Sequence, residues 1–97
     1  MRKIVIHSPG GYEKLRIEEF PDPVPGENEV VVQTVAAGVN YADCSVRWGV
    51  YESAKKFVGW PITPGFEFSG VIVARGKKAK HKLGTKVFGV SLFNSYA

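Results

Sequence analysis

The side chains that bind metals or act as covalent nucleophiles are few and widely spaced in this sequence. The only cysteine is Cys44, and the only histidines are His7 and His81. A structural zinc site needs four clustered Cys and His ligands and a catalytic one needs three, so this spacing predicts no zinc site. Cys44 has no partner for an internal disulfide, and we expect it to pack as a small apolar side chain.

Loops that cradle phosphates or present a nucleophilic serine are also missing. No G-x-G-x-x-G follows an expected strand, no G-x-x-x-x-G-K-[ST] occurs, and there is no G-x-S-x-G elbow. The 97 residues therefore encode no dinucleotide or P-loop cradle of their own.

Positive charge is concentrated in the second half of the chain. Residues 55–97 hold eight of the 13 basic residues and a single acidic residue. Six of the eight lie in one short stretch, Arg75, Lys77, Lys78, Lys80, Lys82 and Lys86. Such a cluster either steers an anionic partner or forms a solvated loop. The stretch contains no aromatic residue for base stacking, which favours the loop, but a small basic β-barrel that binds nucleic acid or a protein stays an alternative.

The polar residues around position 40 are typical of a helix start. Asn40 suits the N-cap and Asp43 the third helical position, where a negative charge is favoured, while Gly49 suits the stop. Arg47 lies four residues after Asp43, so these two side chains are expected to form an ion pair on one helix face.

The remaining elements are expected to be strands. Alternation and β-branched residues predict strands at 2–7, 15–18, 29–37, 66–74 and 87–90, with a loop from 51 to 64. No apolar run approaches the roughly 18–20 residues that a membrane span needs. The length and composition indicate one domain, a small partly closed β-barrel or sandwich.

Three blocks in the sequence resemble a known family: GVNYAD at 38–43, RWGVY at 47–51 and PITPGFEFSGVI at 61–72. They are similar to the N-terminal, GroES-like domain of the medium-chain dehydrogenase/reductase superfamily, and most similar to its zinc-independent quinone oxidoreductase and VAT-1 homologue branch. The resemblance covers residues 1–97. It implies a mainly β fold, a GroES-like partly open β-barrel with one or two short helices. Residues 94–97 look like the start of a further strand.

The resemblance also implies a site. In zinc-dependent relatives, cysteine and histidine ligands stand where this chain has Asn40 and Phe66, so no zinc is implied here. In zinc-independent relatives, the residues matching Asn40 and Tyr51 line the cleft beside the nicotinamide ring. Asn40 as a helix cap alone, and Tyr51 as a packing residue alone, stay open as alternatives. Glu67 is expected near the cleft, in a structural ion pair.

Two departures from the family pattern limit what can be carried over. Thr85 stands where relatives usually carry a turn-stabilising aspartate, and residues 53–60 are longer and more basic than the matching loop. The substrate identity therefore does not follow from the resemblance.

The resemblance finally implies a larger enzyme. Relatives continue into a Rossmann domain that binds NADP(H), so we expect the chain to be the substrate-side part of an NADPH-dependent, zinc-independent reductase of quinones or enone-like substrates. The isolated chain is expected to be inactive. The expected partner is a C-terminal Rossmann domain, and a homodimer stays open; no nucleic acid or membrane is expected. The expected location is the cytoplasm.

Overall fold

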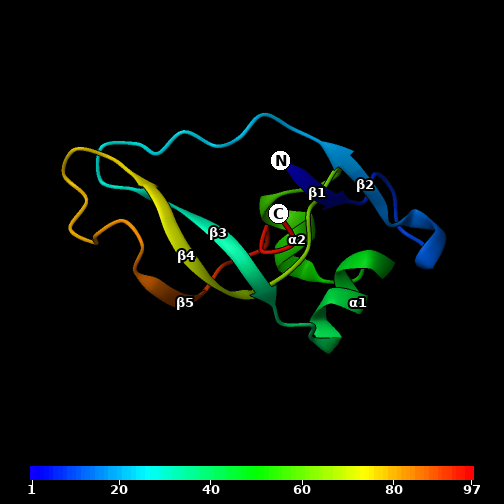
Figure 1. Ribbon diagram of the computed structural model, residues 1–97. Helices are drawn as coiled ribbons and strands as arrows, with labels where there is room; N and C mark the ends of the chain where they lie inside the picture. Colours follow the sequence, from blue (N-terminus) through cyan, green and yellow to red (C-terminus); the bar gives the residue numbers. More distant parts are fainter.

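The computed structural model describes all 97 residues and shows a mainly β chain with two short helices (Figure 1). The β3, β4 and β5 strands form an arm that extends away from the helices, and the molecule measures 40 × 23 × 23 Å. The elements follow in the order β1 (Arg2–Val5), a 3-10 turn (Tyr12–Lys14), β2 (Arg16–Glu19), β3 (Val30–Ala37), α1 (Tyr41–Trp48), α2 (Glu52–Phe57), β4 (Glu67–Arg75) and β5 (Lys86–Val90).

The strands form two separate antiparallel sheets. One contains β1 and β2, and the other has the order β3-β4-β5. Because neither sheet closes on itself, the architecture is a partly open one, and the expected mainly β, GroES-like fold with short helices is confirmed. Neither helix has the length and apolar character needed to cross a bilayer.

The β3-β4-β5 sheet was largely predictable from its residues. Its strands lie within one or two residues of the expected positions, and β3 owes its place to a run of β-branched valines. The backbones of β3 and β4 come so close at Gly70 that a Cβ there would meet the carbonyl oxygen of Gln33. The sequence therefore needs glycine at this point of β4.

A small core joins the helices to the N-terminal sheet. It contains Ile6, Val46, Ala54, Ile62 and Phe93, with Tyr51 and Phe66 packed against it. Ile6 and Ile62 also exchange two backbone hydrogen bonds of 2.9 Å, which attach the end of β1 to the loop after α2. The first strand is consequently shorter than expected, since Ile6 forms an isolated bridge and His7 lies outside it.

Two expectations about local structure were wrong. Residues 52–57 form α2 inside the segment expected to be a loop. Glu52 in its first turn and Lys55 and Lys56 in its last turn favour a helix, and burial of Ala54 against the core holds it in place.

The C-terminal residues are not a strand either. Phe93 and Asn94 have positive φ values of 69° and 68°, which breaks the extended conformation after β5. The segment instead follows the loop before β4, where the N–H groups of Asn94 and Tyr96 donate to the carbonyl oxygens of Thr63 and Pro64 at 2.9 and 3.2 Å.

Candidate functional site

The start of α1 has the cap that the sequence predicted. Asn40 is the N-cap residue in extended conformation, and its backbone N–H donates to Oδ2 of Asp43 at 2.9 Å. Gly49 ends the helix in the left-handed conformation with φ 78°. Both helix ends are therefore fixed by local sequence, which holds Asn40 at the point where β3 gives way to α1.

The carboxylate of Asp43 is the polar centre of this region. Asp43 is buried, with 8% of its surface exposed. Oδ1 accepts a hydrogen bond from the Gly65 N–H at 3.0 Å, and Oδ2 accepts one from the Tyr96 hydroxyl at 2.8 Å besides that from Asn40. Three segments far apart in the sequence thus meet on one carboxylate.

The phenol of Tyr96 is held in its protonated form at this junction. Burial raises the pKa of the Tyr96 hydroxyl far above its ordinary value of 10.0, and the hydrogen bond to the Asp43 carboxylate raises it further. An ionised phenol beside Asp43 would place two negative charges together. Tyr96 therefore acts here as a hydrogen-bond donor.

Arg47 does not pair with Asp43, so the expected ion pair is wrong. Its guanidinium donates to the Gly10 carbonyl oxygen at 2.8 Å and stacks on the rings of Tyr12 and Trp48, 4.8 and 5.5 Å from their centroids. The backbone and phenol donors already occupy the Asp43 oxygens. Arg47 instead binds the turn at residues 8–11 to the C-terminal end of α1, which is the end away from Asn40.

Glu67 also lacks its expected ion pair. It is exposed at the first position of β4, and no lysine, arginine or histidine side chain pairs with it. Its carbonyl oxygen accepts the Gly38 N–H at 3.2 Å, and its side chain lies across Gly38. Glu67 is thus near Asn40 in the fold as an unpaired surface carboxylate.

Tyr51 joins an aromatic cluster at the base of this region. Its ring meets those of Phe66 and Phe93 edge to face, at centroid distances of 5.6 and 6.0 Å. The Tyr51 ring therefore takes part in packing, and its contact with Phe66 places it next to the residue that follows Gly65. Asp43 and Tyr51 both contact the 65–67 segment, and Asn40 is linked to it through Asp43, whereas Arg47 makes no such contact.

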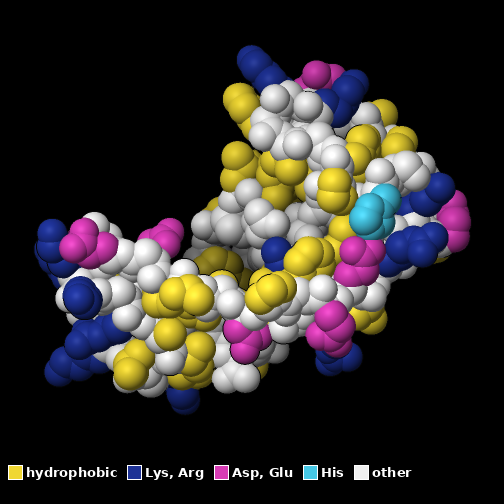
Figure 2. Space-filling model, turned by 90° about the horizontal axis from the view of Figure 1, so that it is seen from above, with side chains coloured by type: hydrophobic (Ala, Val, Ile, Leu, Met, Phe, Trp, Pro, Cys, Tyr) yellow, Lys and Arg dark blue, Asp and Glu magenta, His cyan; other side chains and the backbone are white.

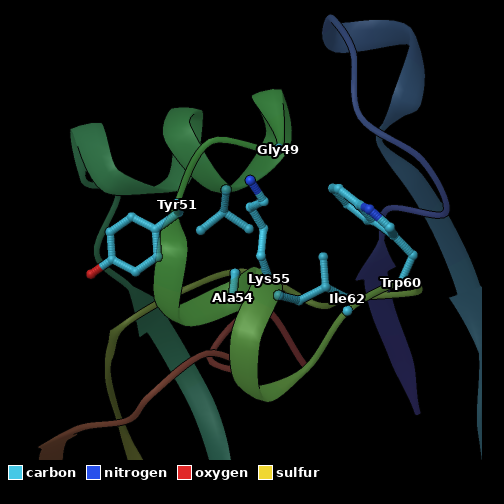
Figure 3. A pocket seen from close by; sticks show the side chains of 8 residues that line it. Gly49, Tyr51, Ala54, Lys55, Trp60 and Ile62 are labelled. Carbon is cyan, nitrogen blue, oxygen red and sulfur yellow. The ribbon is translucent and has the colours of Figure 1, made fainter.

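A small recess lies between the two helices beside Tyr51 (Figure 3). Its volume is about 10 Å³, which is room for one water molecule and far below the roughly 300–1,000 Å³ of most ligand pockets. Ala54 and Ile62 form its apolar base, and Trp60 lies opposite Tyr51. The recess is a packing feature of the α1–α2 pair, and we assign it no ligand.

The residues at the site do not fit a metal ion. No three His, Cys, Asp or Glu side chains gather anywhere in the structure. At the two positions where zinc-dependent relatives are expected to have ligands, Asn40 offers an amide and Phe66 a ring that cannot coordinate. The amide of Asn40, with one acceptor and two donors, instead suits a carboxamide or a carbonyl oxygen.

The basic cluster lies at the opposite end of the molecule. Its residues occupy the end of β4, the loop between β4 and β5 and the start of β5, and Figure 2 shows dark blue side chains gathered at the tip of the arm. Lys78 pairs with Glu27 at 3.4 Å, and Arg75 donates to the His81 carbonyl oxygen at 3.2 Å. None of these contacts involves Asn40 or a residue bonded to it.

The other reactive side chains have structural surroundings. Cys44 is half-buried on α1, and His7 is exposed beside Glu18, with Nε2 and Oε2 2.6 Å apart. The Thr85 hydroxyl donates to the Lys82 carbonyl oxygen at 2.7 Å. A hydroxyl therefore stabilises the turn where an aspartate was expected in relatives.

The open pair of sheets, with a capped helix fixed to the loop before β4, defines a GroES-like domain. The chain belongs to the alcohol dehydrogenase GroES-like domain family, whose model matches residues 26–96. The family is the N-terminal domain of the medium-chain dehydrogenase/reductase superfamily, as the sequence blocks indicated.

Individual relatives agree with this assignment. The chain is 34% identical to the mouse (Mus musculus) synaptic vesicle membrane protein VAT-1 homolog-like over its whole length, and 33% identical to quinone oxidoreductase 1 of Escherichia coli over 98% of it. These alignments cover 23% and 28% of the relatives, so the chain spans about a quarter of their length.

Solved structures show the same likeness. The human VAT-1 homolog-like protein superposes with a TM-score of 0.88 at 33% identity, covering 99% of this chain and 30% of that one. The Escherichia coli quinone oxidoreductase complexed with NADPH superposes with a TM-score of 0.80 at 34% identity, covering 91% of this chain and 26% of that one.

Sequence reasoning missed Gly65 and Tyr96 as members of the site. Gly65 has φ 105°, and a Cβ on it would meet the Ser95 hydroxyl and the Tyr96 ring. Its position after Pro64 was a turn signal, but nothing local in the sequence linked it to Asp43, 22 residues earlier.

Proposed function

We propose that this chain forms the substrate side of the active-site cleft in a zinc-independent, NADPH-dependent reductase of quinones or other activated double bonds. The observation that carries the proposal is the Asp43 junction, which fixes Asn40 beside the 65–67 segment. Support comes from the family, and from quinone oxidoreductases among the relatives, one of them complexed with NADPH.

The nicotinamide of NADPH supplies a hydride when it is bound, and this chain's residues act on orientation. The Asn40 amide donates to the acceptor's carbonyl oxygen or holds the carboxamide of the cofactor, which reduces the freedom of the reacting groups. The Tyr51 ring, stacked edge to face on Phe66, limits the cleft on its apolar side. Neither group forms a covalent bond to the substrate.

The remainder of the enzyme completes the site. Because the chain covers about a quarter of its relatives, we place the nucleotide-binding Rossmann domain in a part of the protein outside these residues. The enzyme is expected in the cytoplasm.

Steady-state kinetics of the full-length enzyme test the proposal. With NADPH and a series of quinones, Asn40→Ala is expected to lower kcat/KM about 10- to 100-fold, since one oriented hydrogen bond is lost. Asn28→Ala is a matched control, because Asn28 lies in the loop before β3, far from α1 in the sequence, and is exposed. Equal kinetics for both variants, or a wild-type enzyme that oxidises no NADPH with any quinone or enone, would contradict the proposal.

Two further measurements separate its parts. Metal analysis of the purified full-length protein is expected to find no stoichiometric zinc, and one zinc per chain would overturn the zinc-independent assignment. Fluorescence titration of the isolated 97-residue chain is expected to show no NADPH binding. Micromolar binding would place the cofactor site within these residues.

A further inference from the structure

The hydrogen bond between Tyr96 and Asp43 is not needed to dock the C-terminal residues. The backbone of this segment is already attached to the loop before β4, through the N–H groups of Asn94, Ser95 and Tyr96. Those bonds place the Tyr96 ring whether or not its hydroxyl finds a partner. The hydroxyl nevertheless donates to Oδ2 of Asp43 at 2.8 Å.

The oxygen that Tyr96 contacts is the one that holds Asn40. Oδ2 of Asp43 accepts both the Tyr96 hydroxyl and the Asn40 N–H, and Oδ1 accepts the Gly65 N–H. A carboxylate has acceptor sites only, so it serves these three donors at once, while an amide in its place would turn an NH2 group toward one of them. The direction of the carboxylate therefore sets the positions of Asn40 and Gly65 together.

We propose that Asp43 and Tyr96 are positioning residues that hold Asn40 and the 65–67 segment at their working separation. This inference rests on the proposed function, in which Asn40 faces the reacting groups. The hydrogen bond from Tyr96 fixes the rotation of the Asp43 carboxylate. The carboxylate in turn fixes the position of the Asn40 backbone through the hydrogen bond from its N–H. Neither residue touches substrate, so their effect falls on the turnover of bound substrate rather than on its binding.

Kinetics of the full-length enzyme distinguish positioning from a stabilising role. Tyr96→Phe keeps the ring and removes only the hydroxyl, and it is expected to lower kcat about three- to tenfold with KM changed less than twofold. Asp43→Asn is expected to lower kcat further, and adding Tyr96→Phe to it should cost little more, because both changes act through one carboxylate. Tyr12→Phe is the matched control, since Tyr12 is exposed and this change likewise keeps the ring and removes only a hydroxyl.

The kcat of each variant is calculated from the concentration of folded enzyme, so that a loss of stability is not mistaken for a loss of turnover. Equal kcat values for Tyr96→Phe and Tyr12→Phe would overturn the inference, and so would a change confined to KM. If Asp43→Asn does not fold, the Tyr96→Phe comparison decides alone.

A second measurement keeps the inference separate from the proposed activity. The 97-residue chain has three asparagines, Asn28, Asn40 and Asn94, so selective ¹⁵N-asparagine labelling of this chain gives few side-chain amide signals. Tyr96→Phe is expected to shift the Asn40 amide signal and leave that of Asn28 in place, even if the enzyme acts on no quinone. An unmoved Asn40 signal would refute the positioning role, whereas an inactive wild-type enzyme with a shifted signal would refute only the proposed function.

Discussion

Asp43 shows how one buried acceptor organises a site whose members are distant in the sequence. Its three donors come from the start of α1, the loop before β4 and the C-terminal segment. Burying a carboxylate is costly unless hydrogen bonds replace its water, and here three donors do so. The same bonds that stabilise the charge therefore bring Asn40, Gly65 and Tyr96 together.

The raised pKa of Tyr96 predicts an alkaline limit to stability. The ordinary pKa of a tyrosine is 10.0, and in the folded protein burial and the hydrogen bond to Asp43 raise the pKa of Tyr96 above that value. Above pH 10 the unfolded chain loses this proton while the folded protein keeps it, so the free energy of unfolding falls as pH rises. Below that pH the contribution is fully present.

Urea unfolding between pH 8 and 11 checks the prediction. Tyr96→Phe should be less stable than the wild type at pH 8 and should lose less stability on going to pH 11. Tyr12→Phe should follow the wild-type curve, because the Tyr12 side chain is exposed. Parallel curves for the wild type and Tyr96→Phe would mean that Tyr96 does not contribute to the alkaline loss.

Gly65 gives a second prediction, in which backbone strain and steric clash are measured separately. Gly65→Ala should destabilise the protein by more than the roughly 1–2 kcal/mol of a left-handed backbone penalty, because its Cβ would also meet Ser95 and Tyr96. Gly59 has φ 75° with open space around it, so Gly59→Ala measures the backbone penalty alone. Equal losses in thermal unfolding would show that the 95–96 segment moves aside without cost.

At the scale of elements, the sequence predicted those helix ends that interactions between neighbouring residues determine. The ends of α1 followed from Asn40, Asp43 and Gly49 because caps act within one turn. The partner of Asp43 was predicted wrongly for the same reason. Spacing along a helix favoured Arg47, whereas two of the three actual partners lie 22 and 53 residues away, where only the tertiary fold could place them.

The helix α2 was missed although its residues favour it. The surrounding segment is rich in Gly and Pro, and six residues of helix leave little periodicity to detect. Its stability comes from the packing of Ala54 in the core. No sequence pattern within the segment predicts that packing. Tyr51 reaches the aromatic cluster from the residue before this helix.

The arm's basic loop gives a prediction at the same scale. Without aromatic residues to stack on bases, the cluster should bind labelled DNA only weakly, and the binding should vanish by about 150 mM salt. The double variant Lys77→Glu, Lys80→Glu should abolish the low-salt binding, with Lys14→Glu, far from the arm, as the control. Binding that persists at 150 mM with a steep salt slope would favour the binding-module alternative.

At the scale of the whole molecule, few side chains are fully buried and the two sheets stay open. Only 14 of the 97 residues are buried, and the core lies between the helices and the N-terminal sheet. The arm contributes little to that core. Among the aromatic residues, Phe93 is buried and Tyr96 half-buried, whereas Tyr41, Trp48 and Phe88 are exposed.

The exposed side of the arm predicts self-association. Phe88 and Val90, 90% and 87% exposed, point the same way on β5, which is an edge strand with unpaired backbone groups. A second copy can cover these side chains and extend the sheet, so sedimentation of the 97-residue chain should show dimers as concentration rises. Phe88→Thr removes the ring and places a β-branched residue, which suits a strand, in its position; it should weaken the dimer about tenfold, equivalent to about 1.4 kcal/mol. Val24→Thr, at an equally exposed position in the loop before β3, should leave it unchanged. A chain that stays monomeric at all concentrations would show that its net charge of +4 outweighs the apolar edge.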